Sequence, residues 1–502
     1  MRIHFCLLLF SCVVVSSARA ELKSGFAERD ISPDIGMERP GGYAKGFHQA
    51  FHDPCKVRAA VFEDEAGFAV LVGLDALVIR QPQVDEARRR IEEATGIPGH
   101  AVMVGASHSH SSGPTGMVLP GEYDHADPWI QELAYEKSSM ADPGYLETMV
   151  DGIVNAVVDA WENRGALPLG FGSGEEETVV FNRRWKMKNG LTYTHPRYGN
   201  PEMIEPAGPV DPEVGVVGAW NEEGKLVGCV VNFACHATAS PPGISANWPW
   251  AMEKVIRGTF GEDVVVVFLN GNSGDVTQVD NASPYRRIGG EEDALKVGGR
   301  VGAEAVKVLL GLQTPLRSSE HEIEAKTEVL SIARRPPSTE RLEEARATVR
   351  ETPRDPAKIN DWIWAKEIVM LDALVADQPV REVEVQAIKV GPAVFISNPA
   401  EFFCEFGLRQ KEESAFAYTW PVSLANGCVG YVPTAEALSE GGGGYETRLT
   451  SYSNLVPEAG DLICDAGIRL ANSMEPGAVQ KPDPAPPFKA GWDYGNVPPE
   501  LD

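Results

Sequence analysis

Two histidines directly follow an apolar segment, a placement that suits metal binding or proton transfer. His108 and His110 lie in the sequence Ser-His-Ser-His-Ser-Ser-Gly-Pro, after a strand expected over residues 101–105. Side chains at positions i and i+2 of an extended segment project to the same side. The two imidazoles could therefore share a metal ion or act as an acid–base pair. A hydrogen-bonded polar loop is the alternative, and the motif alone leaves both open.

A third histidine, His236, also ends an apolar strand, expected over residues 226–234. Layered α/β proteins place their sites at the carboxyl ends of strands, so two strands that end in histidine favour a common site. Cys235 is adjacent, but neighbouring residues on a strand point to opposite faces. A Cys–His nucleophile is therefore disfavoured.

A glycine-containing loop follows the apolar run at residues 264–269 and reads Asn-Gly-Asn-Ser-Gly-Asp-Val-Thr. Its backbone N–H groups could converge on an oxyanion. Ser273 misses the G-x-S-x-G nucleophile elbow by one position, and the phosphate-binding glycine motifs are absent from the loop. Further along, Glu401 stands near the start of an expected helix and Tyr431 precedes a run of glycines. Taken singly, each of these features has an ordinary structural explanation.

The elements that must position these residues alternate apolar strands with helices from residue 21 to about residue 311. Runs without a polar face occupy residues 68–74, 226–234 and 264–269, and a charged helical pattern occupies residues 83–95. This pattern predicts an α/β fold, a layered sandwich of mixed β-sheets flanked by helices. A helical hairpin is expected as an insertion at about residues 339–376, and residues 476–502 are expected to form a proline-rich tail.

Charge and the N-terminal segment limit the partners and the location. The 502 residues are 43% hydrophobic, which excludes a disordered chain, and their net charge of −27 disfavours nucleic acid. Any contact with a membrane surface is expected to be transient. Residues 1–20 combine Arg2, an apolar run and a site for cleavage after Ala20, which predicts a signal peptide and a secreted or periplasmic protein without a transmembrane segment. The six cysteines beyond this segment are expected to be buried thiols with at most one disulfide.

Taken together and in order, these motifs resemble the neutral/alkaline, non-lysosomal ceramidase family, specifically its N-terminal zinc-hydrolase domain. The resemblance covers residues 25–470 and implies one hydrolase domain over residues 21–475. The segments that carry it are Asp30-Ile-Ser-Pro33, Gly42-Tyr43-Ala44, His108-Ser-His110-Ser, Asn182-Arg183, Asn232-Phe-Ala-Cys-His236, Gly274-Asp-Val-Thr277, Pro399-Ala-Glu401 and Tyr431-Val-Pro-Thr434.

The resemblance implies Zn²⁺ as cofactor and a reaction in which water activated by zinc cleaves the N-acyl amide of a ceramide-like lipid. The products would be a fatty acid and a sphingosine-like amine. The implied zinc ligands are His108, His236, Glu401 and Tyr431. The implied catalytic residues are His110 for proton transfer, Arg183 to hold a substrate oxygen, Asp275 to order the loop or a histidine, and Thr277.

Two departures from the family keep other functions open. Thr277-Gln278-Val279 stands where the family has Ser-Pro-Asn, and threonine keeps the hydroxyl but adds a methyl group. Only about seventy residues follow Tyr431, so no C-terminal immunoglobulin-like domain is expected. The alternatives are a metal-independent serine hydrolase that uses Ser273 with His236, and an inactive homologue that binds a lipid or a glycan.

Overall fold

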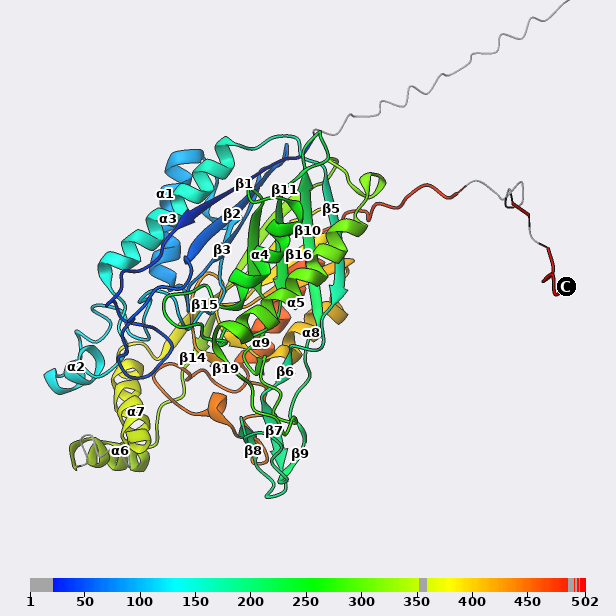
Figure 1. Ribbon diagram of the computed structural model, residues 1–502. Helices are drawn as coiled ribbons and strands as arrows, with labels where there is room; N and C mark the ends of the chain where they lie inside the picture. The colour runs from blue at the N-terminus through cyan, green and yellow to red at the C-terminus, as the bar shows by residue number, and fades with distance from the viewer. Residues whose placement is uncertain (1–20, 352–358, 486–491, 493, 496) are drawn as a thin grey trace, which may run out of the picture.

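The first of the main sheets contains strand β4, which leads directly into the loop that carries His108. In the computed structural model the described residues are 21–351, 359–485, 492, 494–495 and 497–502, so the expected signal peptide over residues 1–20 lies outside them. The sheet has the order β1-β2-β3-β4, antiparallel except for the parallel pair β3 and β4 (Figure 1). Its strands are β1 (Lys23–Asp30), β2 (Lys56–Glu63), β3 (Phe68–Leu74) and β4 (Val102–Ala106).

Helix α1 (Gln81–Thr95) makes the crossover that the parallel pair β3 and β4 requires. Pro82 in its first turn fits the helix start, where a backbone N–H is not needed. Gly96 ends the helix in the left-handed conformation at φ 76°, and its N–H donates to the Glu92 carbonyl. Pro and Gly thus set the two ends of the element that precedes β4 and the histidine loop.

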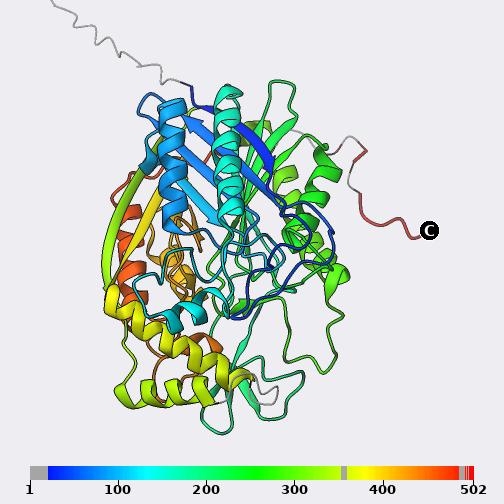
Figure 2. The same cartoon turned by 90° about the vertical axis from the view of Figure 1, so that its left-hand side faces the viewer.

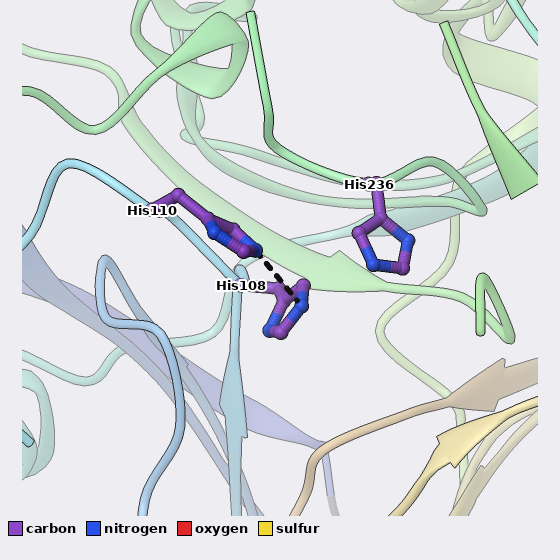
Figure 3. A group of neighbouring side chains, drawn as sticks. All are labelled: His108, His110 and His236. Carbon is purple, nitrogen blue, oxygen red and sulfur yellow. Dashed lines mark hydrogen bonds between the residues drawn. The ribbon is translucent and has the colours of Figure 1, made fainter. Parts of the chain in front are cut away.

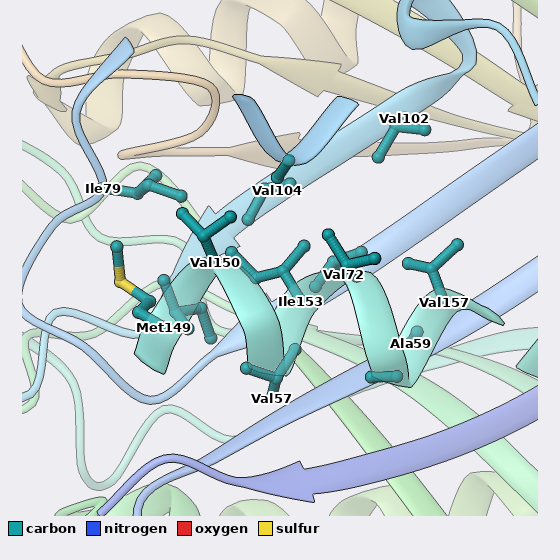
Figure 4. Close-up of a cluster of buried hydrophobic side chains, with 14 of the residues drawn as sticks. Val57, Ala59, Val72, Ile79, Val102, Val104, Met149, Val150, Ile153 and Val157 are labelled. Atoms are coloured by element: carbon teal, nitrogen blue, oxygen red, sulfur yellow. The ribbon is translucent and has the colours of Figure 1, made fainter. Parts of the chain in front are cut away.

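Helix α3 (Pro143–Glu162) packs its apolar face on this sheet. Met149, Val150, Ile153 and Val157 follow the helical repeat and are buried against the sheet. Figure 4 shows these side chains directed at residues of the strands, which include Val57, Ala59, Val72 and Val104. Burial of this kind contributes about 1.5–3 kcal/mol for each large aliphatic side chain.

The second sheet has the order β12-β11-β10-β5, with β11 and β12 parallel and the other pairs antiparallel. Its crossover helix α4 packs against α5, and both helices lie beside this sheet in Figure 1. The bounds are β5 (Leu169–Glu175), β10 (Glu213–Trp220), β11 (Leu226–Phe233), α4 (Trp248–Phe260), β12 (Val265–Asn270) and α5 (Gly290–Gly311).

The third sheet has the order β14-β15-β16-β18, again with one parallel pair, β16 and β18. Helices α8 and α9 pack beside it. The bounds are β14 (Ile323–Ala333), β15 (Val380–Val390), β16 (Ala393–Ser397), α8 (Cys404–Glu413), β18 (Tyr418–Val422) and α9 (Ala459–Asn472). Each of these sheets is mixed and flanked by helices, so the predicted fold class is confirmed.

Helices α6 (Thr339–Glu351) and α7 (Ile359–Asp377) lie between β14 and β15 in the chain and pack against each other (Figure 2). Helix α7 also contacts α2 (Pro128–Tyr135), and their apolar side chains share one cluster that includes Ile130, Trp362 and Val369. These helices therefore close one end of the molecule.

The remaining elements are short. They are η1 (Gly99–Ala101), β6 (Phe181–Asn182), β7 (Arg184–Met187), β8 (Thr192–Thr194), β9 (Met203–Pro206), β13 (Val276–Thr277), η2 (Thr314–Leu316), β17 (Glu401–Phe402), β19 (Tyr431–Val432) and η3 (Tyr445–Thr447). No helix among the described residues combines the length and apolar character needed to cross a bilayer. The six cysteines described are all buried and unpaired.

The first two sheets approach each other closely at Gly73, in β3. An ideal Cβ atom built there would lie only 2.4 Å from the carbonyl oxygen of Phe268, in β12. We expect Gly73→Ala to lower the free energy of unfolding by about 2 kcal/mol, because the backbone of one sheet must move. The matched control is Gly258→Ala in α4, where the new Cβ atom meets nothing within 4 Å; it should be neutral or stabilising by up to about 1 kcal/mol. Chemical denaturation checks both, and equal midpoints for the two variants would contradict the expectation.

Candidate metal centre

Three side chains meet at one buried point: His108 and His236 from the loops after β4 and β11, and Glu401 from the short strand β17. The Nε2 atoms of His108 and His236 each lie 3.1 Å from the same carboxylate oxygen, Oε2 of Glu401. The relative exposures of the three residues are 2%, 1% and 4%. His110 is the next neighbour, with its Nε2 3.3 Å from that of His108, and Figure 3 shows the three imidazoles directed toward one another. The three rings place one nitrogen each within 4.8 Å of the others, close enough to hold a metal ion.

The hydrogen bonds on the far side of the rings decide what the facing nitrogens can do. Nδ1 of His108 lies 2.9 Å from the Leu77 carbonyl oxygen, and Nδ1 of His236 lies 2.6 Å from the Ser273 carbonyl oxygen. A carbonyl oxygen only accepts, so both Nδ1 atoms carry the proton and a neutral ring has a lone pair at Nε2. Two lone pairs facing a carboxylate oxygen repel it unless positive charge lies between them, either a metal ion or a proton on one of the rings. The donor set therefore fits a metal ion, and the anchored Nδ1 atoms are typical of ligating histidines.

His110 differs from the other two histidines. The contacts of the described residues include no backbone carbonyl at its Nδ1, and its ring is only partly buried. The ring packs against Gly41, where an ideal Cβ atom would lie 2.3 Å from Nδ1. His110 is thus less firmly oriented than a typical metal ligand and is closer to solvent.

The local backbone corrects one expectation about the histidine loop. Strand β4 ends at Ala106, and His108 has a left-handed backbone with φ 63°, so His108 and His110 do not share an extended segment. Their rings meet because the chain turns at His108. A left-handed backbone costs a non-glycine residue about 1–2 kcal/mol, and the Nδ1 bond of His108 to Leu77 and the Ser109 N–H bond to Ala76 hold it there.

Glu401 and Tyr431 are brought together by strand pairing, which corrects a second expectation. Helix α8 begins at Cys404, and Glu401 belongs to β17 rather than to a helix start. Strand β17 pairs in parallel with β19, with Glu401 directly opposite Tyr431. The Tyr431 hydroxyl accepts a hydrogen bond of 3.0 Å from Arg183. The carboxylate and the phenol therefore reach the site from neighbouring strands.

Burial and the close charges set the protonation states. Burial alone would raise the pKa of Glu401, but the facing imidazoles hold it well below its usual range. Burial, and then Arg183, lowers the pKa of His236 to about 4. Burial, and then His108, lowers the pKa of His110 well below its usual value. The centre thus offers a carboxylate beside the neutral imidazoles of His236 and His110 at neutral pH, a protonation state that suits metal binding.

The glycine loop lies next to the centre but directs its side chains elsewhere. The carboxylate of Asp275 accepts from Asn182 (2.7 Å) and from the Cys404 N–H (2.9 Å), and so it orders the loop rather than a histidine. The Thr277 hydroxyl is buried and donates to Gln278 at 3.0 Å. Both ring nitrogens of His236 are engaged by other groups, so His236 does not serve as a base for the hydroxyl of Ser273. This geometry disfavours the metal-independent serine hydrolase.

Three partners of the centre carry no signal in the sequence. The Tyr452 hydroxyl donates to Oε1 of Glu401 at 2.9 Å, and Arg183 donates to the fully buried carboxylate of Glu446 at 2.6 Å. Tyr445 packs its ring on Tyr431, with ring centroids 5.5 Å apart. The glycine run before Tyr445 indicates a loop. The sequence does not indicate that this loop contacts Arg183, because the two segments are far apart in the chain and meet only in the folded protein.

The buried pair of Arg183 and Glu446 gives a stability prediction. We expect Arg183→Met to lower the free energy of unfolding by about 3 kcal/mol, because it leaves most of the charge of Glu446 unpaired at 0% side-chain exposure. Arg89→Met, on the exposed face of α1 with a side chain 53% exposed, is the control and should change stability by less than about 0.5 kcal/mol. Urea titrations compare the two; a small effect at Arg183 would mean that Arg184 alone compensates Glu446.

Known proteins resemble this chain in sequence and in fold. No family model matches the chain. The neutral ceramidase of Pseudomonas aeruginosa is 24% identical to it in an alignment of 305 residues that covers 56% of this chain. The match spans 42% of that relative, less than half of its length.

Solved structures of ceramidase superpose on the chain over most of its length. The crystal structure of neutral ceramidase from Pseudomonas aeruginosa gives a TM-score of 0.66 at 18% identity and covers 92% of this chain and 76% of the other. A structure of ceramidase complexed with C2 gives the same TM-score and identity, with 93% and 77% covered. The resemblance predicted from the motifs is therefore confirmed: the chain shares the fold of neutral ceramidase, and part of its sequence is similar to that of a neutral ceramidase.

Proposed function

We propose that this protein is a zinc-dependent amidohydrolase that cleaves the N-acyl amide of a ceramide-like lipid into a fatty acid and a sphingosine-like amine. The observation that carries this function is the buried donor set of His108, His236 and Glu401, in which both Nε2 atoms face one carboxylate oxygen at 3.1 Å. The relation to neutral ceramidase supports the choice of a lipid amide as substrate.

His108, His236, Glu401 and Tyr431 would hold the metal. Imidazole nitrogen and carboxylate oxygen are ligands that zinc prefers in hydrolases. When bound, zinc supplies a Lewis acid that polarises a carbonyl and makes water nucleophilic near neutral pH. Burial raises the pKa of Tyr431 well above its usual value, so in the absence of a cation this ligand remains a neutral phenol held by Arg183.

The other residues would bind and orient the substrate and move its proton. His110 is a neutral imidazole beside the donor set, and it would carry a proton to the nitrogen of the departing amine. Arg183 would hold a substrate oxygen, since its guanidinium already reaches the Tyr431 hydroxyl. Thr277 would replace the family serine as the hydroxyl that orients the substrate, which requires this hydroxyl to turn away from Gln278. Asp275 would keep the glycine loop in place.

Export would bring the enzyme to its substrate. The expected cleavage after Ala20 would release a secreted or periplasmic protein, with residues 21–475 as the hydrolase domain and residues 476–502 as its tail. With a net charge of −27, contact with an anionic membrane surface would be transient. A lipid amide is the only partner that this function requires.

Turnover of a fluorescent N-acyl sphingosine tests the function. We expect zinc-loaded wild type to release the fatty acid, and His236→Ala to lose at least about 1,000-fold in rate because a ligand is removed. His100→Ala, on an exposed residue, is the control and should keep wild-type activity. Full activity after zinc removal would exclude the metal mechanism. Binding without turnover by folded, zinc-loaded protein would favour the inactive lipid-binding alternative.

The support that Tyr452 gives to Glu401 is tested separately. We expect Tyr452→Phe to weaken zinc binding by about 10- to 100-fold, because it removes the hydrogen bond that orients the ligand carboxylate. Competition with a chromophoric chelator measures the affinity directly. Tyr285→Phe, at a side chain 81% exposed, is the matched control. Unchanged affinity in Tyr452→Phe would show that Glu401 is oriented by its histidine partners and its strand alone.

A further inference from the structure

Three arginines line a small cavity on the other side of Tyr452 from the metal centre. The cavity has a volume of about 30 Å³, and Arg80, Arg334 and Arg381 contribute to its lining together with Cys428 and Tyr452. Arg80 precedes α1, Arg334 follows β14, and Arg381 lies on the adjacent strand β15. The fold therefore gathers these guanidinium groups from distant parts of the chain.

The charges around this cavity do not balance. Glu122 is the one carboxylate among the lining residues, against three guanidinium groups. It is already occupied, because it accepts from Arg80 at 2.5 Å and from the Leu119 N–H at 2.9 Å. A further carboxylate, Glu367 of α7, accepts from the Ser451 hydroxyl in the cavity wall but is paired with Lys366 at 3.0 Å. No ion pair among the described residues involves the buried Arg334 or the half-buried Arg381. Two positive charges thus remain without a close counterion in that part of the chain, and isolated charges away from water are costly.

Hydrogen-bond donors are also left over on two of the arginines that line this cavity. Arg80 and Arg334 are 8% and 9% exposed, and the buried Nε atom of each has no hydrogen-bond partner among the described residues. Burial, and then Arg381, lowers the pKa of Arg334 to about 10; burial, and then Arg80, lowers the pKa of Arg381. Buried donors without an acceptor destabilise the folded state. A negatively charged hydrogen-bond acceptor would satisfy the free N–H groups and would also stabilise the charged form of these arginines.

We propose that this cavity is a binding site for one small monovalent anion of the halide class. Its volume admits one chloride ion among the guanidinium groups. Water alone would satisfy the free N–H groups but would leave the charge uncompensated. The anion would also fix the wall that contains Tyr452, whose hydroxyl donates to Glu401. The site stands on its own geometry and does not depend on the proposed amidohydrolase activity.

Bromide provides the direct test, since it scatters anomalously at its absorption edge. Crystals of the zinc-loaded protein grown over a series of bromide concentrations should show an anomalous peak between the three arginines, with an occupancy that saturates. In Arg334→Met the occupancy at a half-saturating concentration should fall at least about threefold, because one of the three cationic groups is removed. Arg89→Met, on the exposed face of α1, should bind bromide like wild type.

Thermal unfolding gives a second readout that needs no crystals of a variant. At constant ionic strength and a fixed scan rate, replacing gluconate by chloride should raise the Tm of wild type by about 2 °C or more, and of Arg334→Met by much less. If Arg334→Met does not fold, Arg381→Met at the half-buried strand position replaces it. Absence of a bromide peak in the wild-type cavity, or equal occupancy in wild type and the arginine variant, would overturn the proposal.

Discussion

The contact between a buried carboxylate and two imidazoles is the constraint on which the rest of the site depends. Glu401 is almost fully enclosed, and a carboxylate in such a place is tolerated only when opposite charge and hydrogen bonds compensate it. Its partners are two Nε2 atoms whose rings are fixed from behind by backbone carbonyls, and a tyrosine hydroxyl on its other oxygen. Removing the cation that this set fits would leave lone pairs facing a negative oxygen. The centre is therefore both the candidate source of chemistry and a place where folding and metal binding are coupled.

The three main sheets meet at this centre, which explains why the whole domain is needed to build it. His108 follows β4 of the first sheet, His236 follows β11 of the second, and Glu401 follows β16 of the third within a few residues. Each residue lies beyond the carboxyl end of its strand, where layered α/β proteins collect functional groups. Close packing of the sheets, as at Gly73 against β12, then sets the distances between them. A shift of one sheet relative to another would separate His108, His236 and Glu401 even if each strand kept its own structure.

Buried charges are balanced on one side of the centre, at Arg183, and are not balanced on the other side, at the arginine-lined cavity. Arg183 is neutralised by Glu446 and still reaches the Tyr431 hydroxyl, so one cation serves both the stability of the core and the candidate site. On the far side of Tyr452, by contrast, arginines outnumber carboxylates around a small cavity. Buried cations without partners are costly, and an anion at this place would complete the wall that supports Glu401. Stability and function would then share one network of polar contacts.

The sequence by itself determined the strands and helices of the layered fold, the residue types at the strand ends and the family resemblance, because hydrophobic periodicity and short motifs are local properties. It misjudged the conformation at His108 and at Glu401, where a left-handed turn and a two-residue strand replace an extended segment and a helix start. It gave no sign of the pair between Arg183 and Glu446, 263 residues apart, or of the arginine cavity. Only the tertiary structure decided these features, because they depend on charges and hydrogen bonds between buried groups from segments far apart in the chain.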